Sequence, residues 1–325
     1  MIFQSKIKAV AGMVVTLLAS PLAADPLPSW NAGETRSAII AFVDAVTDPT
    51  SDDYVTPSDR IAVFDNDGTL WAEQPVYFQL YFALDQVKKM DASSLNSDAL
   101  KAAAAGDIEA LLATGKDGIL EVLAVAHTGM SVADFKATVD EWLAEATHPT
   151  TGKPYTAMVY QPMLELLSYL RDEDFATYIV SGGGIDFIRV LSEDAYNIPV
   201  NQVIGSSLIS EYVADGDSPA LMKKPDLFFN DDKAGKPVAI NHHIGKRPIF
   251  AGGNSDGDFQ MLEWTTSGDG PAFGLYVHHT DAEREWAYDR EGHIGVLNRG
   301  LEEGGNRGWY FADMAQDWAV IWPEE

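Results

Sequence analysis

The chain of 325 residues contains no cysteine. It therefore has no disulfide, no thiol nucleophile and no thiolate ligand for a metal. Basic residues are also few, with 22 lysines and arginines against 49 aspartates and glutamates and a formal net charge of −27. A surface this acidic argues against nucleic acid or an anionic membrane as a partner. Any site for an anion must therefore carry its own local positive charge.

Long apolar runs are scarce as well. One apolar stretch at residues 9–18 follows Lys6 and Lys8 and precedes the small residues of 19–24. This is the layout of a secretory signal peptide, and the stretch is too short to span a bilayer. We expect residues 1–24 to be such a signal, with an uncleaved membrane anchor as the alternative. The mature protein is then expected to be soluble, without membrane contact, and periplasmic or secreted in a bacterium.

Strand and helix patterns alternate along the rest of the chain. Between the first two strands, residues 78–147 are almost wholly helical in pattern. Alternating strands and helices predict an α/β fold with a doubly wound parallel sheet, into which this helical block is inserted. We expect the core to comprise residues 25–77 and 148–325. The expected strands are residues 61–64, 177–180, 203–206, 248–251 and 274–277, and expected core helices include 35–46, one starting at Pro162, and 259–264.

Two carboxylates stand at the end of the first expected strand. Asp65 and Asp67 follow the apolar run 61–64 and precede a glycine and a threonine. Open parallel sheets bind their ligands at this edge. Acids this close repel each other unless a cation lies between them or one of them holds a proton. An Asp-rich turn is the alternative interpretation.

Three further segments have polar residues at strand or helix ends. Ser181 begins a Ser-Gly-Gly-Gly run before a helix, which is either an anion cradle or a flexible turn. Lys236 lies immediately before an expected helix, where a solvated surface lysine is the ordinary alternative. The strand 248–251 leads into the oxygen-rich turn 253–258, and oxygen ligands suit Mg²⁺.

Taken in order, these segments resemble the haloacid dehalogenase superfamily. The motifs are Asp-x-Asp-Gly-Thr at 65–69, the serine at 181, a lysine, and Gly-Asn-Ser-Asp-Gly-Asp at 253–258. The resemblance is nearest to phosphoserine-phosphatase-like members, which have all-helical caps. It implies a Rossmann-like core with residues 78–147 as the cap. It also implies an exported, Mg²⁺-dependent phosphomonoesterase that hydrolyses a small phosphorylated metabolite through an aspartyl-phosphate intermediate.

The resemblance assigns roles residue by residue. Asp65 is the expected nucleophile, and Asp67 is the expected acid and base. Mg²⁺ is expected on the Asp65 carboxylate, the Asp67 carbonyl and a side chain of the last motif. Ser181, the Gly182 N–H and Lys236 are expected to hold the phosphoryl oxygens. The expected substrate-binding residues are Gly68, Thr69, Gly182, Glu73 and Gln74; the last two, with Trp71 and Tyr77, either select the substrate or form a hinge to the cap.

The chain departs from the family at the metal and substrate positions. The family usually has Gly-Asp where this chain has Gly253-Asn254, so a neutral ligand is expected to weaken Mg²⁺ binding. Asp258 matches the second acid of that motif, as ligand or support, with Asp256 as the alternate. Phosphoserine phosphatases carry a glutamate nine residues after the nucleophile, where this chain has Gln74, so phosphoserine is a doubtful substrate. The lysine is Lys236 or Lys233, and its place before a helix favours Lys236.

Other functions remain open. A dehalogenase needs no proton donor for halide, so Asp67 argues against that activity. A phosphonatase, a phosphomutase, or a non-catalytic phosphate-binding protein on the same scaffold are further alternatives, the last prompted by Asn254. The histidine pairs 242–243 and 278–279 are not expected to bind metal, since neighbouring side chains on a strand point to opposite faces. Trp309, Trp318 and Trp322 are expected to be packing residues, and the charged run 281–290 to form helical ion pairs.

Overall fold

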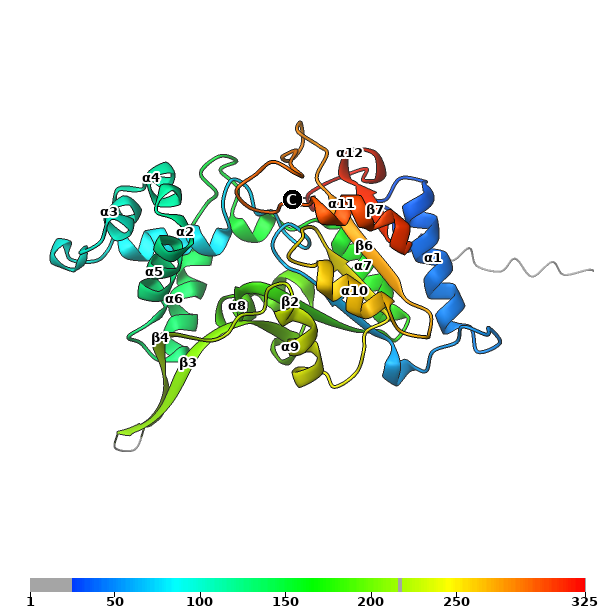
Figure 1. Ribbon diagram of the computed structural model, residues 1–325, viewed down its shortest axis with the longest axis horizontal. Helices are drawn as coiled ribbons and strands as arrows, with labels where there is room; N and C mark the ends of the chain where they lie inside the picture. Colours follow the sequence, from blue (N-terminus) through cyan, green and yellow to red (C-terminus); the bar gives the residue numbers. More distant parts are fainter. Residues whose placement is uncertain (1–24, 216–217, 325) are drawn as a thin grey trace, which may run out of the picture.

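The computed structural model describes residues 25–215 and 218–324 (Figure 1). The expected signal peptide, residues 1–24, lies outside the described residues. In the described part of the chain, none of the helices has both the length and the apolar character needed to cross a membrane.

A seven-stranded sheet forms the centre of the molecule, in the order β4-β3-β2-β1-β5-β6-β7. All neighbouring strands are parallel except β3 and β4, which form an antiparallel hairpin. The chain moves outward from β1 in one direction through β2 and β3, and in the other through β5, β6 and β7. This confirms the predicted α/β class and places the topological switch point between β1 and β5. The strands are β1 (Ile61–Phe64), β2 (Ala176–Gly184), β3 (Val203–Asp215), β4 (Ser218–Phe229), β5 (Phe250–Gly253), β6 (Phe273–His278) and β7 (Tyr310–Asp313).

Strand β1 is buried on both faces, and its side chains divide between two cores. Ala62 and Phe64 pack in the core that includes α1 and α7, while Ile61 and Val63 pack in the core that includes α9 and α10. Alternate residues of a strand point to opposite faces, so helices on both sides are needed to cover this strand. The core helices are α1 (Glu34–Thr47), α7 (Gln161–Asp172), α8 (Ile185–Tyr196), α9 (Gly235–His243), α10 (Phe259–Thr266), α11 (Arg299–Glu303) and α12 (Met314–Asp317).

Five α-helices and no strand lie between residues 78 and 145, at one end of the molecule (Figure 1). The Ser131 hydroxyl accepts the Asp134 N–H at 3.0 Å, the helix cap that the sequence indicates. We refer to these helices as the cap. They are α2 (Phe78–Val87), α3 (Asp98–Ala105), α4 (Ile108–Ala113), α5 (Gly115–His127) and α6 (Val132–Glu145). Across the described residues, the short 3-10 helices are Pro57–Asp59, Ala92–Ser94, Tyr155–Ala157, Val200–Gln202 and Gly305–Arg307.

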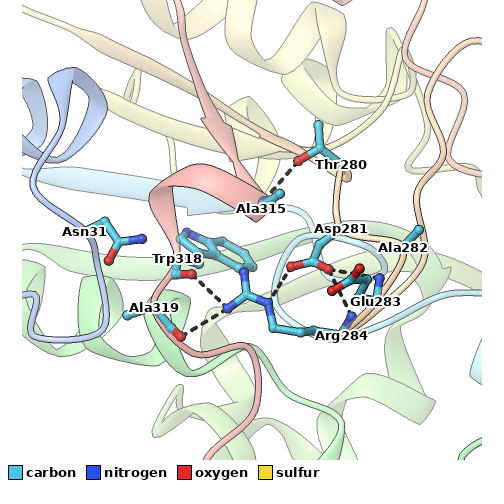
Figure 2. Close-up of a pocket in the computed structure, with 9 residues that line it drawn as sticks. All are labelled: Asn31, Thr280, Asp281, Ala282, Glu283, Arg284, Ala315, Trp318 and Ala319. Carbon is cyan, nitrogen blue, oxygen red and sulfur yellow. Dashed lines mark hydrogen bonds and ion pairs between the residues drawn. The ribbon is translucent and has the colours of Figure 1, made fainter.

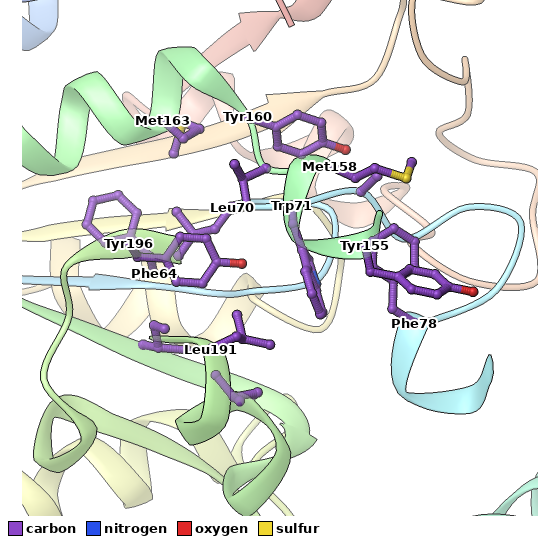
Figure 3. Packing of buried hydrophobic residues seen from close by; sticks show 14 of the residues in the cluster. Phe64, Leu70, Trp71, Phe78, Tyr155, Met158, Tyr160, Met163, Leu191 and Tyr196 are labelled. Carbon is purple, nitrogen blue, oxygen red and sulfur yellow. The ribbon is translucent and has the colours of Figure 1, made fainter. Parts of the chain in front are cut away.

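An aromatic cluster fixes the point where the chain leaves the core for the cap (Figure 3). Trp71 is fully buried and lies edge-on to Phe78, with ring centres 4.8 Å apart. Phe78 in turn contacts Tyr155, at 4.7 Å, where the chain returns to the core. The two crossing segments are therefore packed against each other rather than joined by a loose linker.

The two edges of the sheet differ from the strands expected from the sequence. Strand β3 extends to Asp215 and pairs with β4, although only residues 203–206 were expected and β4 was not expected at all. Most of β4 is exposed, so it lacks the apolar pattern that marks a buried strand. Strand β7 was also missed. The β3–β4 hairpin projects beside the cap (Figure 1), and β4 packs against α5 and α6.

The charged run after β6 is not helical, contrary to expectation. Arg284 pairs with Asp281 and also donates to the carbonyls of Trp318 and Ala319, both at 3.0 Å (Figure 2). These bonds cross to the C-terminal segment, so tertiary contacts override the helical spacing of the charges. Trp318 is buried, as the sequence indicates. Arg284 lines a surface hollow, and its bonds there hold the loop after β6 against the C-terminal segment.

A glycine lies under an aromatic ring where β1 meets β5. Phe64 is paired in register with Gly252, and a Cβ on Gly252 would lie 2.7 Å from Cδ1 of that ring. We expect Gly252→Ala to lower the free energy of unfolding by about 1–3 kcal/mol, because the buried ring must shift. Urea denaturation measures the change. Gly270→Ala is the control, since nothing lies within 4 Å of its Cβ position; equal losses in the two variants would contradict the packing argument.

Candidate active site

The predicted site residues converge at the C-terminal edge of the sheet, around the switch point. Asp65 follows β1, and its N–H donates to the Gly252 carbonyl of β5 at 2.9 Å. Ser181 lies within β2, which continues through the glycines to Gly184. Lys236 is in the first turn of α9, and the turn that contains Asn254 follows β5.

Lys236 joins these segments. Its Nζ donates to Asp65 Oδ1 at 2.7 Å, to Asp258 Oδ1 at 2.6 Å and to the Val180 carbonyl at 2.8 Å. Burial alone would lower the pKa of Lys236, but the charges of Asp258 and Asp65 raise it above its ordinary value. The ammonium is therefore a permanent buried charge. Lys233 is exposed, so the structure brings Lys236 and not Lys233 to Asp65.

Asp258 supports the turn after β5. Its Oδ1 accepts from Lys236, and its Oδ2 accepts the N–H groups of Asn254 at 2.9 Å and Ser255 at 3.0 Å. Both oxygens thus have partners within the protein. Asp256, the alternate, accepts N–H groups of Arg299 and Gly300 at the start of α11, at 3.0 and 2.9 Å.

Asp65 and Asp67 share an environment that disfavours two negative charges. Burial, followed by the charge of Asp258, raises the pKa of Asp65 to about 8, with Lys236 opposing the shift. Burial raises the pKa of Asp67 to about 6, although the Trp71 indole N–H donates to its Oδ1 at 2.8 Å and opposes the shift. A carboxyl with a pKa near neutrality can both give and take a proton.

Glu73 lies behind Asn254, in an arrangement that sequence reasoning missed. Asn254 Nδ2 donates to Glu73 Oε1 at 2.7 Å, and the Tyr288 hydroxyl donates to the same oxygen at 2.8 Å. On the other side, the Thr69 hydroxyl donates to Asn254 Oδ1 at 3.3 Å. Burial raises the pKa of Glu73 well above its ordinary value. The carboxylate absent from position 254 thus has a counterpart one side chain away.

Backbone groups of the β2 glycine run complete the edge. The Gly183 N–H donates to the Ser181 hydroxyl oxygen at 3.1 Å, and the Gly184 N–H donates to Gln79 Oε1 at 2.7 Å. Gly182 is exposed to the cavity. Gln79 is on α2, so this bond joins the core to the cap.

The predicted substrate-binding residues separate into two groups. Glu73 and Gly182 line a cavity of about 820 Å³ that also contains Asp65, Asp67, Ser181 and Lys236. Gly68, Thr69 and Gln74 do not line it. Thr69 faces Asn254, the Gly68 carbonyl is 2.7 Å from His279 Nε2, and the Gln74 carbonyl is 3.0 Å from His148 Nε2. Those three residues shape the turn and the exit to the cap rather than the cavity wall.

Some residues of the site had no signal in the sequence. Tyr288 and Gln79 lie in a loop and in the cap, far along the chain from the residues they contact. Asp231 is also buried near Lys236, and burial raises its pKa to about 7. Within the described residues, no cluster of three or more His, Cys, Asp or Glu side chains is arranged to hold a metal by itself. A metal here would therefore need amide or carbonyl oxygens as well.

A family model for haloacid dehalogenase-like hydrolases matches residues 62–263. The chain belongs to this family. The match spans the catalytic aspartates expected after β1, the cap, and the turn after β5, so the predicted superfamily is confirmed. A search of curated proteins found no match.

Solved structures share the fold at low identity. A conserved protein of unknown function from Anaerococcus prevotii is 16% identical with a TM-score of 0.56, and the alignment covers 89% of this chain and 94% of that one. A protein of unknown function from Bordetella pertussis is 15% identical with a TM-score of 0.51, over 78% and 98% of the chains. A phosphoserine phosphohydrolase-like protein from Francisella tularensis is 18% identical, with a TM-score of 0.41 over 76% and 98%. The first two likenesses show the fold alone.

The buried Lys236 should contribute strongly to the free energy of unfolding. We expect Lys236→Met, measured in EDTA, to lower the free energy of unfolding by about 3–5 kcal/mol, because it leaves two buried carboxylates without their cation. The pKa of Asp65 is already raised, so the native state takes up a proton as the pH falls. At pH 5 Asp65 is protonated and does not need a cation beside it. The loss of stability in Lys236→Met should therefore be larger at pH 8 than at pH 5.

Lys233→Met is the matched control for this variant. Lys233 is exposed and three residues away, so the same charge change should cost under about 0.5 kcal/mol at either pH. Urea denaturation of both variants measures the difference. A Lys236→Met variant as stable as the control would contradict the ion-pair network.

Proposed function

We propose that this protein is an Mg²⁺-dependent phosphomonoesterase that acts through an aspartyl-phosphate intermediate. One observation carries the proposal: Asp65 is held by the buried Lys236 and, together with Asp67, lines one cavity. Membership of the hydrolase family supports the same reaction.

In the proposed reaction, a carboxylate oxygen of Asp65 attacks phosphorus in line with the ester oxygen. The phosphorus–ester oxygen bond breaks, and Asp67 gives its proton to the departing alkoxide. Asp67 then takes a proton from the water that attacks the aspartyl-phosphate, which releases phosphate and restores Asp65. Lys236, the Ser181 hydroxyl and the Gly182 N–H stabilise the phosphoryl oxygens. The alcohol and inorganic phosphate are the products.

The residues at the site fit Mg²⁺. Asp65, Asp67, Glu73 and Asp258 bring four carboxyl groups close together, and Lys236 is the cation that the described residues place among them. The Asp65 carboxylate, the Asp67 carbonyl and Asn254 Oδ1 would hold the ion, an all-oxygen set that Mg²⁺ prefers. Bound there, it would neutralise charge on the phosphoryl group and the nucleophile. Asp258, with both oxygens bonded elsewhere, would support the turn.

Glu73 makes Asn254 a suitable ligand in this proposal. The bonds from Asn254 Nδ2 to Glu73 and from the Thr69 hydroxyl to Asn254 Oδ1 fix the orientation of the amide. The charge of a bound Mg²⁺ would oppose the effect of burial on Glu73 and favour its carboxylate, which would then supply the negative charge that the family places at position 254. Glu73 thus fulfils the supporting role that carboxylates around metal ligands commonly have.

We expect Glu73→Gln to weaken Mg²⁺ binding by about tenfold or more, because it removes charge behind the ligand. Calorimetric titration of the metal-free protein with MgCl₂ measures this without any substrate. Glu141→Gln, on an exposed part of α6, is the control for the loss of one negative charge. An unchanged dissociation constant in Glu73→Gln would contradict the role given to Glu73.

Two supports favour the phosphatase over its rivals. A proton donor at Asp67 serves an alkoxide leaving group, whereas halide needs none. Asp65, Asp67 and Lys236, the proposed nucleophile, acid and cation, also line one cavity, an arrangement that a binding protein does not require. We also propose export to a periplasmic or secreted location, for which the signal-like pattern of residues 1–24 is the support.

The deciding experiment is a panel of phosphomonoesters and a 2-haloacid, assayed with Mg²⁺ and with EDTA. We expect phosphate release that EDTA abolishes and that Asp65→Asn lowers at least a thousandfold, since the nucleophile is lost. Asp140→Asn on α6 is the control and should keep its activity. Halide release without metal would establish the dehalogenase instead, and ester binding without turnover would establish the binding protein.

A further inference from the structure

The cavity of the proposed active site continues far beyond the phosphoryl end. Its volume is about 820 Å³, and its walls include the cap helix α5 and both strands of the β3–β4 hairpin. Cavities of roughly 300–1,000 Å³ hold drug-sized ligands. The space is therefore large for a phosphate on a two- or three-carbon metabolite.

The wall at the cap end is aliphatic and aromatic. Leu112, Ile119, Leu120 and Leu123 line it from the cap, and Leu227 lines it from β4. Leu120 is 46% exposed and Leu227 is 53% exposed. Apolar side chains left open to solvent around a cavity mark a surface that a ligand covers.

Gln79 and His127, two polar residues of the cavity wall, already have partners. Gln79 accepts the Gly184 N–H at 2.7 Å, and its Nε2 is 2.8 Å from His127 Nε2. His127 Nδ1 is 2.5 Å from the Leu123 carbonyl, so both ring nitrogens are bonded. Burial lowers the pKa of His127 to about 4, with Lys223 adding to the shift, and the ring is neutral at pH 7.

Two charged residues that line this end, Lys223 and Asp186, form a pair. Lys223 Nζ bonds to Asp186, and the ammonium lies 4.7 Å over the Phe135 ring. Both residues line the cavity, and their charges cancel. Asp232 belongs to the opposite, phosphoryl end, where its Oδ1 would lie 2.9 Å from a Cβ on Gly257.

From these contacts we infer the substrate class: monophosphate esters of apolar alcohols, alkyl or aryl, whose organic group fills the cap end of the cavity. The inference rests on the proposed phosphatase function and extends it. Against this apolar wall, an ammonium, a carboxylate or a ring of sugar hydroxyls would lose its water without gaining partners, which is costly. An alkyl or aryl group gains from the same burial.

A graded series of esters tests the inference. We expect kcat/KM to rise from methyl to butyl to octyl phosphate, by about two- to fourfold for each methylene buried. All are used below the concentration at which octyl phosphate forms micelles. Phenyl and 2-naphthyl phosphate separate aryl from alkyl preference. Phosphoserine, glycerol 3-phosphate and glucose 6-phosphate should be poorer than butyl phosphate.

Two leucines of the same strand make a matched pair of variants. Leu227 lines the cavity and Leu221 does not, although the two are similarly exposed: Leu227 is 53% exposed and Leu221 is 50% exposed. Leu227→Ser should lower kcat/KM for octyl phosphate by about tenfold and leave methyl phosphate unchanged. Leu221→Ser should change neither. Leu120→Ser repeats the test from the cap.

The outcomes separate the inference from the function beneath it. Equal kcat/KM across the alkyl series, or a preference for phosphoserine or a sugar phosphate, would overturn the apolar substrate class and leave the phosphatase intact. An equal loss for methyl and octyl phosphate in Leu227→Ser would also overturn it. Failure to hydrolyse any ester would remove both proposals.

Discussion

The site depends on one buried ammonium group. Lys236 contacts the carboxylate after β1, a carbonyl of β2 and the turn after β5, so one side chain joins three strands at the switch point. Burying a charge is costly unless it is paired and hydrogen-bonded, and Lys236 makes three such bonds. The pairs also explain why Asp258 serves the turn: one oxygen holds the lysine and the other holds two backbone N–H groups. The position of Asp65 therefore follows from electrostatics as well as from the sheet.

A carboxyl group lies beside the position where the family usually has an aspartate. Asn254 stands where the family usually has an aspartate, and Glu73 approaches it from the segment that leaves β1 for the cap. Gly68 and Gly295 make this approach possible, because a Cβ at either would lie within 2.4 Å of Glu73 Oε1. Both glycines also have φ in the left-handed region, at 72° and 64°. The amide, the carboxylate and the Tyr288 hydroxyl thus form one unit that connects the β1 exit, the β5 turn and the loop after β6.

Sequence patterns predicted the part of the fold that is buried on both sides. Residues 61–64 form β1 at the expected bounds because an unbroken apolar run has few other structures open to it. Strand β4 was not predicted because its side chains are mostly exposed. Its position depends on pairing with β3 and packing on the cap. The same distinction holds in the site. Asp65, Lys236 and Asp258 follow from their places at strand and helix ends, whereas Tyr288 and Gln79 are brought in by tertiary packing.

The acidic composition bears on how the two ends of the cavity would attract a substrate. Two lysines line it, Lys236 at the phosphoryl end and Lys223 at the cap end, and both are paired with carboxylates. Among the lining side chains that the structure describes, neither end therefore offers an unpaired lysine to an anionic substrate, and the protein as a whole repels one. In the proposed enzyme, a metal ion supplies attraction at the phosphoryl end, and burial of an apolar group supplies it at the cap end. Apolar burial is the one contribution that a surface of this charge does not weaken, since it does not depend on the sign of the field.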